Sequence, residues 1–130
     1  MTTGLTKEDI ALLTEPQIAC VATVNADGSV QRTPVWVDTD GEAVLFNTTK
    51  GRVKHQNIER NPNVSVLVVD TNDAHRWVSV RGRAEIVEEG ADEHIDRLAV
   101  KYTGQDFSPS RQAGQVRITV RVVPEHRIAE

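Results

Sequence analysis

A run of basic residues from Lys50 to Arg60 is the part of this sequence best suited to bind a ligand. It contains four Lys or Arg and one Glu, although the whole chain of 130 residues has 15 basic and 19 acidic residues. The run starts where a predicted strand gives way to a predicted helix. A helix start offers unpaired backbone N–H groups and the positive end of the helix dipole, and Gly51 allows the backbone to approach a ligand closely. The pattern predicts an anion site, and a solvated basic helix face is the alternative.

The other residues that commonly do chemistry form no recognisable catalytic or metal-binding set. The four histidines, at positions 55, 75, 94 and 126, are not spaced as metal ligands, and no Ser/His/Asp or Cys/His arrangement is visible. Cys20 is the only cysteine and has apolar neighbours, so we expect a small core residue rather than a nucleophile. The sequence therefore assigns no catalytic residue and no metal.

The composition is that of one ordinary globular domain spanning residues 1–130, with 38% hydrophobic and 26% charged residues. The formal net charge of -4 argues against a nucleic-acid partner, which would need a broad basic surface. No apolar run is long enough to cross a membrane, and the N-terminus lacks the pattern of a signal peptide. We expect a cytoplasmic protein with no membrane partner and with a small anionic ligand.

The spacing of apolar and turn-forming residues predicts six strands and three helices. Thr6, with Asp9 three residues later, is suited to begin the first helix, and Asp27-Gly28 predicts a tight turn between the first two strands. Gly82 interrupts a long strand and indicates a bulge or bend. The strands cover residues 17–24, 29–37, 42–48, 64–69, 76–88 and 115–123, and the second and third helices cover residues 51–60 and 91–102. These elements predict a small antiparallel barrel.

Several segments in this order resemble a known family of enzymes. They are Thr33-Pro34-Val35-Trp36-Val37, Lys50-Gly51-Arg52-Val53-Lys54, Arg76-Trp77-Val78-Ser79-Val80-Arg81-Gly82-Arg83-Ala84 and Lys101-Tyr102-Thr103-Gly104. Together they resemble the split β-barrel flavin and deazaflavin oxidoreductases of the pyridoxamine-5'-phosphate-oxidase-like superfamily, most closely the branch that uses coenzyme F420. The resemblance implies a mainly β fold, a six-stranded antiparallel split β-barrel of the FMN-binding type with short helices.

The resemblance also implies a homodimer with two cofactor sites at the subunit interface. Arg52 and Lys54 match the positions that hold the cofactor phosphate, and such charge-assisted contacts are strong. Trp77 would reach the site from the other subunit, although a tryptophan packed for structural reasons is the alternative. The other residues expected at the cofactor are Lys50, Gly51 and Gln56 beside the phosphate, and Gln31, Pro34, Val35, Trp36, Asn47, Thr48 and Thr49 along the ring and ribityl chain.

The resulting hypothesis is an F420-dependent oxidoreductase that transfers a hydride from the reduced deazaflavin to a small unsaturated or conjugated acceptor. The cofactor ring performs such a transfer, so a dedicated acid or base is not required. The extra basic residues Arg60, Arg76 and Arg81 favour an oligoglutamate tail over bare FMN. Lys101 and Tyr102 are candidates for shaping the substrate pocket, with a structural role as the alternative.

Two alternatives remain open. An FMN-binding oxidoreductase would use the same phosphate contacts, and a non-catalytic protein could carry F420, FMN or haem without turnover. The chain lacks the long C-terminal extension, with its Arg- and Trp-containing motif, of true pyridoxamine phosphate oxidases, so we expect no pyridoxamine phosphate oxidation. The substrate cannot be predicted, because its choice depends on loops such as residues 105–114.

Overall fold

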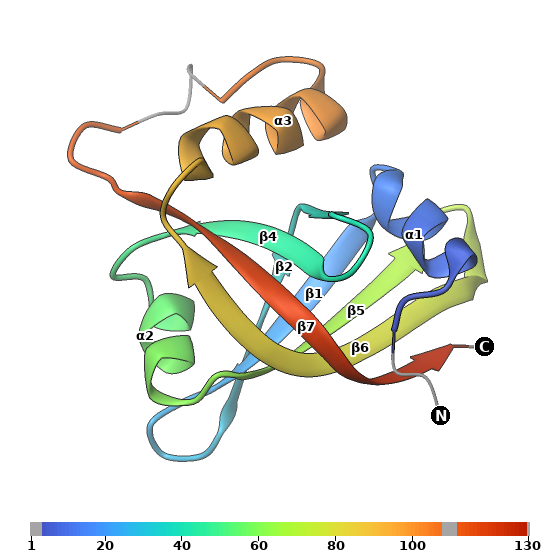
Figure 1. The fold of residues 1–130 in the computed structure, drawn as a ribbon, viewed down its shortest axis with the longest axis horizontal. Helices are drawn as coiled ribbons and strands as arrows, with labels where there is room; N and C mark the ends of the chain where they lie inside the picture. Colours follow the sequence, from blue (N-terminus) through green and yellow to red (C-terminus); the bar gives the residue numbers. More distant parts are fainter. Residues whose placement is uncertain (1–3, 108–111, 130) are drawn as a thin grey trace.

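The fold is a curled antiparallel sheet, seen in a computed structural model that describes residues 4–107 and 112–129. Its seven strands lie in the order β2-β1-β5-β6-β7-β4-β3. The two outermost strands, β2 (Val30–Val35) and β3 (Val37–Thr39), are consecutive in the sequence, and only Trp36 separates them. The sheet therefore curls until its two edges approach each other, and the opening between them is the split of a split barrel (Figure 1).

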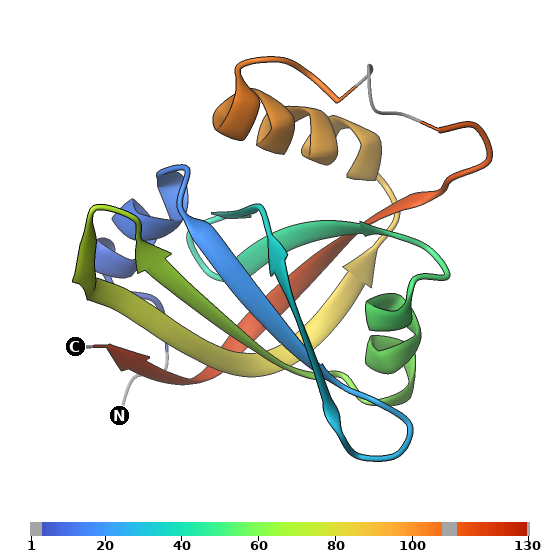
Figure 2. The same cartoon turned by 180° about the vertical axis from the view of Figure 1, so that it is seen from behind.

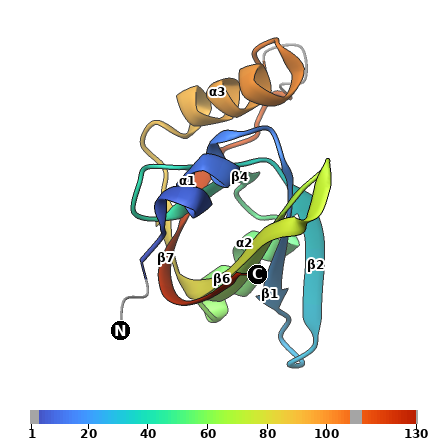
Figure 3. The same cartoon turned by 90° about the vertical axis from the view of Figure 1, so that its right-hand side faces the viewer.

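The strands between these edges pair as antiparallel neighbours throughout the sheet. They are β1 (Ile18–Val24), β5 (Asn63–Asp70), β6 (Asp73–Val87), β7 (Arg117–Ala129) and β4 (Val44–Thr49). Figure 2 shows β1, β2 and β5 from behind. In the side view of Figure 3, β1 and β2 form one wall and β7 lies on the opposite wall.

Alternate residues of these strands fill the interior with apolar side chains, as the two-residue period of a strand requires. Val21, Phe46, Val66, Val80 and Val120 come from five different strands and are all buried in one continuous core. Burial of such side chains stabilises the fold by about 1.5–3 kcal/mol each. The intervening residues then point outward and form the outer face of the sheet.

Three helices surround the barrel. Helix α1 (Lys7–Thr14) and helix α2 (Val53–Arg60) lie at opposite ends, and helix α3 (Ala91–Thr103) lies alongside, above β4 in Figure 1. The predicted start of α1 is confirmed, because Asp9 N–H donates to Thr6 Oγ1 at 3.1 Å and Thr6 N–H donates to Asp9 Oδ2 at 2.9 Å. Asp9 also accepts from Arg127 Nε at 2.7 Å, which ties this helix to β7.

The predicted split barrel is confirmed, with seven strands instead of six. The predicted strand 29–37 breaks at Trp36, so its two parts form the opposite edges of the split. Helix α2 begins at Val53 rather than at residue 51, because Gly51 has a φ of 93°, which no right-handed helix accommodates. The predicted strand 42–48 covers Val44–Thr49 instead.

The last strand, β7, continues to Ala129 rather than ending at residue 123. Pro124 has no N–H and so cannot complete a regular ladder. It lies opposite Gly82, where the register between β6 and β7 shifts. A Cβ atom on Gly82 would lie 1.8 Å from the backbone oxygen of Val123. The predicted irregularity at Gly82 is therefore confirmed. The register shift there allows β7 to continue pairing with β6 beyond Pro124.

Cys20 is not the core residue that its apolar neighbours predicted. Ala19 and Val21 point into the barrel, so Cys20 lies on the outward face of β1 and is partly exposed. The run of small apolar residues was misleading because both faces of this strand are apolar. Of the predicted loop 105–114, residues 108–111 lie outside the described residues.

Candidate functional site

A pocket of about 410 Å³ lies beside the split of the barrel. This is large enough for a small molecule or part of a cofactor. Its walls come from the end of β2, the end of β4, the start of α2, one side of α3 and the start of β7. The lining residues are Ile18, Pro34, Val35, Trp36, Asn47, Thr48, Thr49, Arg52, Lys54, Ile95, Leu98, Phe107 and Arg117.

Three cations, Arg52, Lys54 and Arg117, line the pocket. Burial lowers the pKa of Lys54, and the positive charges of Arg52 and Arg117 lower this pKa further. Within the described ranges, the side chains of Arg52 and Lys54 make no hydrogen bond or ion pair with the protein. Because like charges brought together are unfavourable without a counter-charge, this group is suited to hold an anion.

Arg117 is held by residues of the neighbouring strand. Its Nε donates to Asn47 Oδ1 at 2.8 Å, and its Nη1 donates to Thr49 Oγ1 at 2.9 Å. The guanidinium also lies over the ring of Phe107, with 5.0 Å between its carbon and the ring centroid. These contacts fix the guanidinium before any ligand arrives, which lowers the entropic cost of binding.

The remaining lining is largely apolar and includes the aromatic Trp36. The indole stacks on the ring of Tyr102, which belongs to α3. The Tyr102 hydroxyl donates to the backbone oxygen of Gln17 and accepts from the backbone N–H of Val37 at 3.2 Å. Lys101 donates to the backbone oxygens of Leu13 and Val37, and burial lowers its pKa. Lys101 and Tyr102 thus fasten α3 to the split, and neither lines the pocket itself.

The structure brings most of the sequence-predicted site residues together in this pocket. Those that line it are Pro34, Val35, Trp36, Asn47, Thr48, Thr49, Arg52 and Lys54. Gln31 does not line it, although it lies on the same side of β2 as Val35. The Oε1 atom of Gln31 is buried without a hydrogen-bond partner in the described part of the chain. Such an orphaned acceptor is costly unless a ligand or water satisfies it.

Three other predicted residues serve the start of α2 instead of the pocket. Lys50 pairs with Glu88 at 2.8 Å. Gln56 Nε2 donates to the backbone oxygen of Gly51 at 2.8 Å, and the Gly51 N–H donates to His55 Nδ1 at the same distance. These two bonds satisfy the backbone oxygen and the N–H of Gly51, which precedes the N-cap residue Arg52. Lys50, Gly51 and Gln56 therefore shape the turn that presents Arg52 and Lys54.

Trp77 lies away from this pocket within a single chain. It lines a separate surface hollow with Asp9, Arg76 and Arg127. Two of the basic residues proposed to attract a polyanion are also engaged elsewhere. Arg76 forms ion pairs with Glu15 and Asp70 at 2.7 and 2.8 Å, and Arg60 donates to Asn57 Oδ1 at 2.7 Å.

Sequence reasoning missed Arg117 and the apolar wall of the pocket. In the sequence, Arg117 is one polar residue of an alternating strand. Only the pairing of Thr49 with Arg117 between β4 and β7 brings it to the cations of α2. Knowledge of that register would have identified it. The missed apolar residues are Ile18, Ile95, Leu98 and Phe107.

In residues 4–107 and 112–129, no group of three or more His, Cys, Asp or Glu side chains is arranged to hold a metal ion. None of the helices in those ranges combines the length and the apolar composition needed to cross a membrane.

Comparison with known sequences gives one family match. The pyridoxamine 5'-phosphate oxidase family matches residues 5–127. A pyridoxine/pyridoxamine 5'-phosphate oxidase from Aeromonas hydrophila is 40% identical over 76 residues, which make up 58% of this chain and 36% of that protein. A protein with the same name from Kineococcus radiotolerans is 38% identical over 73 residues, 32% of its length. The chain thus matches well under half of each relative.

Comparison with solved structures finds the same architecture over almost the whole chain. An F420 reductase superposes with a TM-score of 0.82 and 30% sequence identity, covering 92% of this chain and 95% of that one. A conserved hypothetical protein from Mycobacterium tuberculosis superposes with a TM-score of 0.74 and 27% identity, covering 98% of this chain and 86% of that one.

Proposed function

The chain belongs to the pyridoxamine 5'-phosphate oxidase family, and from this premise we propose that it is an oxidoreductase that uses reduced coenzyme F420 to reduce a small unsaturated or conjugated acceptor. Family membership and the oxidase relatives support redox chemistry. The likeness to an F420 reductase, which extends over 92% of this chain, supports the choice of cofactor.

The observation that carries this proposal is the pairing of cations with an apolar, aromatic lining in one pocket. Arg52, Lys54 and Arg117 suit a phosphate, and Trp36, Pro34 and Leu98 suit a flat ring. Burial lowers the pKa of Lys54 and the charges of Arg52 and Arg117 lower this pKa further, and the negative charge of a phosphate would oppose both effects. The unsatisfied Oε1 of Gln31 offers a further acceptor to a ligand that extends along β2.

In this proposal the bound deazaflavin supplies the hydride from its own ring. The chain binds and orients it: Arg52, Lys54 and Arg117 fix one end, and Trp36 limits the tilt of the ring. Apolar residues of α3 exclude water from the ring, which favours transfer to the acceptor over side reactions. Hydride addition to the acceptor must be completed by a proton, which water can supply, so no protein acid or base is assigned.

We also propose that the protein acts as a homodimer that covers the outward face of β1, β5, β6 and β7. Cys20, Leu67, Ser79 and Ile128 form one row across these four strands. Leu67 is 40% exposed, Ile128 is 53% exposed and nearby Ile18 is 61% exposed. Exposed apolar side chains that share one face of a sheet favour association with a second copy. The proposed role of Trp77 depends on this dimer, because Trp77 does not line its own chain's pocket.

An FMN-dependent oxidoreductase is the second candidate, and one observation favours it. Arg60 and Arg76 are already bound to protein groups, so they are less able to recognise the oligoglutamate tail that would distinguish F420. The cations of the pocket would bind either phosphate. A non-catalytic carrier of F420, FMN or haem would share the binding site and differ only in the absence of turnover.

The proposal is tested by mixing the protein with reduced F420 and a panel of small α,β-unsaturated carbonyl compounds. Return of the absorbance of the oxidised deazaflavin measures turnover. We expect protein-dependent oxidation that the Arg52→Ala/Lys54→Ala variant abolishes and the Lys50→Ala variant retains, because Lys50 lies outside the pocket. Tight F420 binding without oxidation by any acceptor would instead support a carrier.

A further inference from the structure

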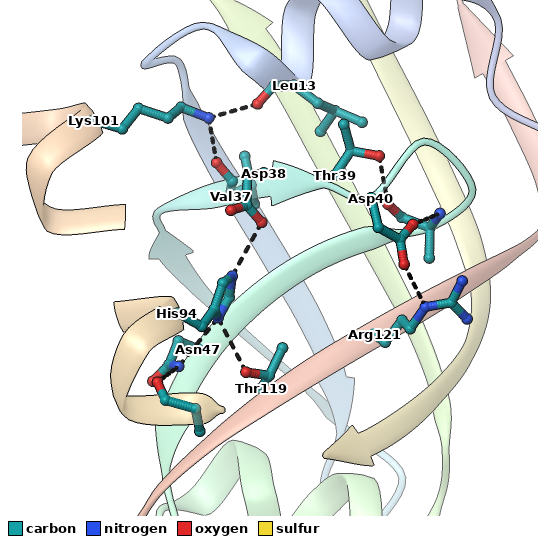
Figure 4. Close-up of polar contacts among 12 residues, drawn as sticks. Leu13, Val37, Asp38, Thr39, Asp40, Asn47, His94, Lys101, Thr119 and Arg121 are labelled. Atoms are coloured by element: carbon teal, nitrogen blue, oxygen red, sulfur yellow. Dashed lines mark hydrogen bonds and ion pairs between the residues drawn. The ribbon is translucent and has the colours of Figure 1, made fainter. Parts of the chain in front are cut away.

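A buried histidine lies behind the cations of the pocket. His94 belongs to the first turn of α3 and is only 2% exposed. As Figure 4 shows, its ring lies between β3, β4 and β7. Its Nε2 is 3.1 Å from Asp38 Oδ1, and its Nδ1 is 3.2 Å from Asn47 Nδ2 and 3.1 Å from Thr119 Oγ1.

The guanidinium of Arg117 can only donate hydrogen bonds, and this fixes the donors and acceptors of Asn47 and His94. Arg117 Nε donates to Asn47, so the atom it meets is the amide oxygen Oδ1. The amide nitrogen of Asn47 must then donate to the backbone oxygen of Ala91, at 2.9 Å, and to His94 Nδ1. Consequently Nδ1 is the acceptor of the imidazole, and its Nε2 carries the hydrogen that is donated to Asp38.

We propose that His94 is a positioning residue for the anion site: Asp38 fixes its tautomer, His94 fixes the amide of Asn47, and Asn47 aims the guanidinium of Arg117. This inference rests on the proposed function only in taking the bound anion to be a cofactor phosphate. The wrong tautomer would set an N–H of His94 against the Asn47 amide nitrogen. Rotation of the amide would then set that nitrogen against Arg117 Nε, which is also a donor.

Two substitutions distinguish the roles of the two ring nitrogens of His94. In His94→Asn, the amide oxygen can occupy the place of Nδ1 and accept from Asn47. In His94→Gln, the longer side chain can place its amide nitrogen near Nε2 and donate to Asp38, but it removes the Nδ1 acceptor, so the Asn47 amide nitrogen keeps only the backbone oxygen of Ala91. Asn leaves the larger gap in the core, so it costs more stability.

The first measurement is the affinity for F420 and for FMN, with thermal unfolding followed in parallel. We expect His94→Gln to weaken binding by about tenfold and His94→Asn to stay within about threefold of the wild type. A merely structural role predicts the reverse order, with affinity following stability. That reverse order, or equal affinities for both variants and the wild type, would overturn the proposal.

The second measurement uses ligand-free protein, so it does not depend on the cofactor. The ¹⁵N shifts of the His94 ring should show a hydrogen on Nε2 and none on Nδ1, and the Arg117 Nε–H signal should move in His94→Gln but not in His94→Asn. A hydrogen on Nδ1, or an Arg117 signal that is indifferent to both substitutions, would overturn the proposal. If the wild type bound neither F420 nor FMN, only the proposed function would fail, and these signals would still decide the role of His94.

Discussion

The indole of Trp36 stacks on the ring of Tyr102, with 5.5 Å between the centroids and an angle of 14° between the planes. Trp36 is the single residue between the two edge strands of the sheet, and Tyr102 lies in the last turn of the helix that covers the pocket. The stack therefore connects the split of the barrel to α3. It also fixes the aromatic wall against which we propose that the cofactor ring lies.

Two substitutions of Tyr102 distinguish the role of its ring from the role of its hydroxyl. Tyr102→Phe keeps the stack but leaves the Val37 N–H and the Gln17 oxygen without that partner, so we expect a loss of about 1–3 kcal/mol in the free energy of unfolding and unchanged cofactor affinity. Tyr102→Leu should also weaken affinity several-fold, because Trp36 loses its support. Denaturant unfolding and cofactor titration measure the two effects. Unchanged affinity in Tyr102→Leu would contradict the proposed role of the stack.

Lys54 should take up a proton when an anion binds at alkaline pH. Burial lowers the pKa of Lys54 in the folded protein, and the positive charges of Arg52 and Arg117 lower it further. The negative charge of a bound phosphate offsets those two positive charges, so it raises the pKa of Lys54 again. Calorimetry at about pH 9.5 in buffers of different ionisation enthalpy should show uptake in the wild type and little in Lys54→Met. Equal binding enthalpies in all buffers for the wild type would contradict this prediction.

The same shift has a consequence for stability in the unliganded protein. Because the folded pKa of Lys54 lies below its unfolded value of about 10.5, the unfolded chain binds more protons between those two values. The contribution of Lys54 to the free energy of unfolding should therefore rise with pH in that window. Lys54→Met should remove this rise, and the difference between the two unfolding profiles measures it.

Gly82→Ala should destabilise the barrel strongly. A Cβ atom there would lie 1.8 Å from the Val123 oxygen, and that oxygen belongs to the backbone, which cannot move without disturbing the β6–β7 pairing. We expect a loss of more than about 2 kcal/mol. Gly28→Ala is the matched control, because nothing lies within 4 Å of its Cβ position and only its positive φ adds a cost of about 1–2 kcal/mol. Similar melting temperatures for both variants would contradict the close approach.

Leu67→Glu should convert the proposed homodimer into monomers, since it places a charge in the middle of the outward apolar face. Val87→Glu is the control, because Val87 is 39% exposed, close to the 40% of Leu67, but lines a separate hollow beside Arg121. Sedimentation equilibrium measures the mass, and circular dichroism checks the fold. A wild type that is monomeric at all concentrations would contradict the proposed dimer and leave Trp77 without a role in the site.

Local signals in the sequence were read correctly where one residue type decides the structure. Thr6 and Asp9 form the predicted capping box, and the first hairpin turns at Asp27-Gly28. The break at Trp36 was missed, because residues 29–37 have strand character throughout and only the closure of the barrel divides them. The extension of β7 past Pro124 was missed for a similar reason: the register shift that admits the proline depends on the pairing of β7 with β6 at Gly82.

The residues of the candidate site also differ in whether the sequence alone could identify them. Arg52 and Lys54 lie close in sequence and could be recognised as a pair, whereas Arg117 joins them through the register of β4 with β7. His94 could not be interpreted from the sequence either. Its neighbours Asp38, Asn47 and Thr119 come from three strands that meet only in the folded barrel.

Titration of the purified protein with F420 and, separately, with FMN decides whether the pocket is an F420 site, with tryptophan fluorescence as the signal because Trp36 lines the pocket. The proposed function predicts that F420 binds more tightly than FMN, that Arg52→Ala/Lys54→Ala weakens this binding at least about 30-fold, and that Lys50→Ala leaves it unchanged. Binding of neither compound, or binding that the double substitution leaves intact, would contradict it.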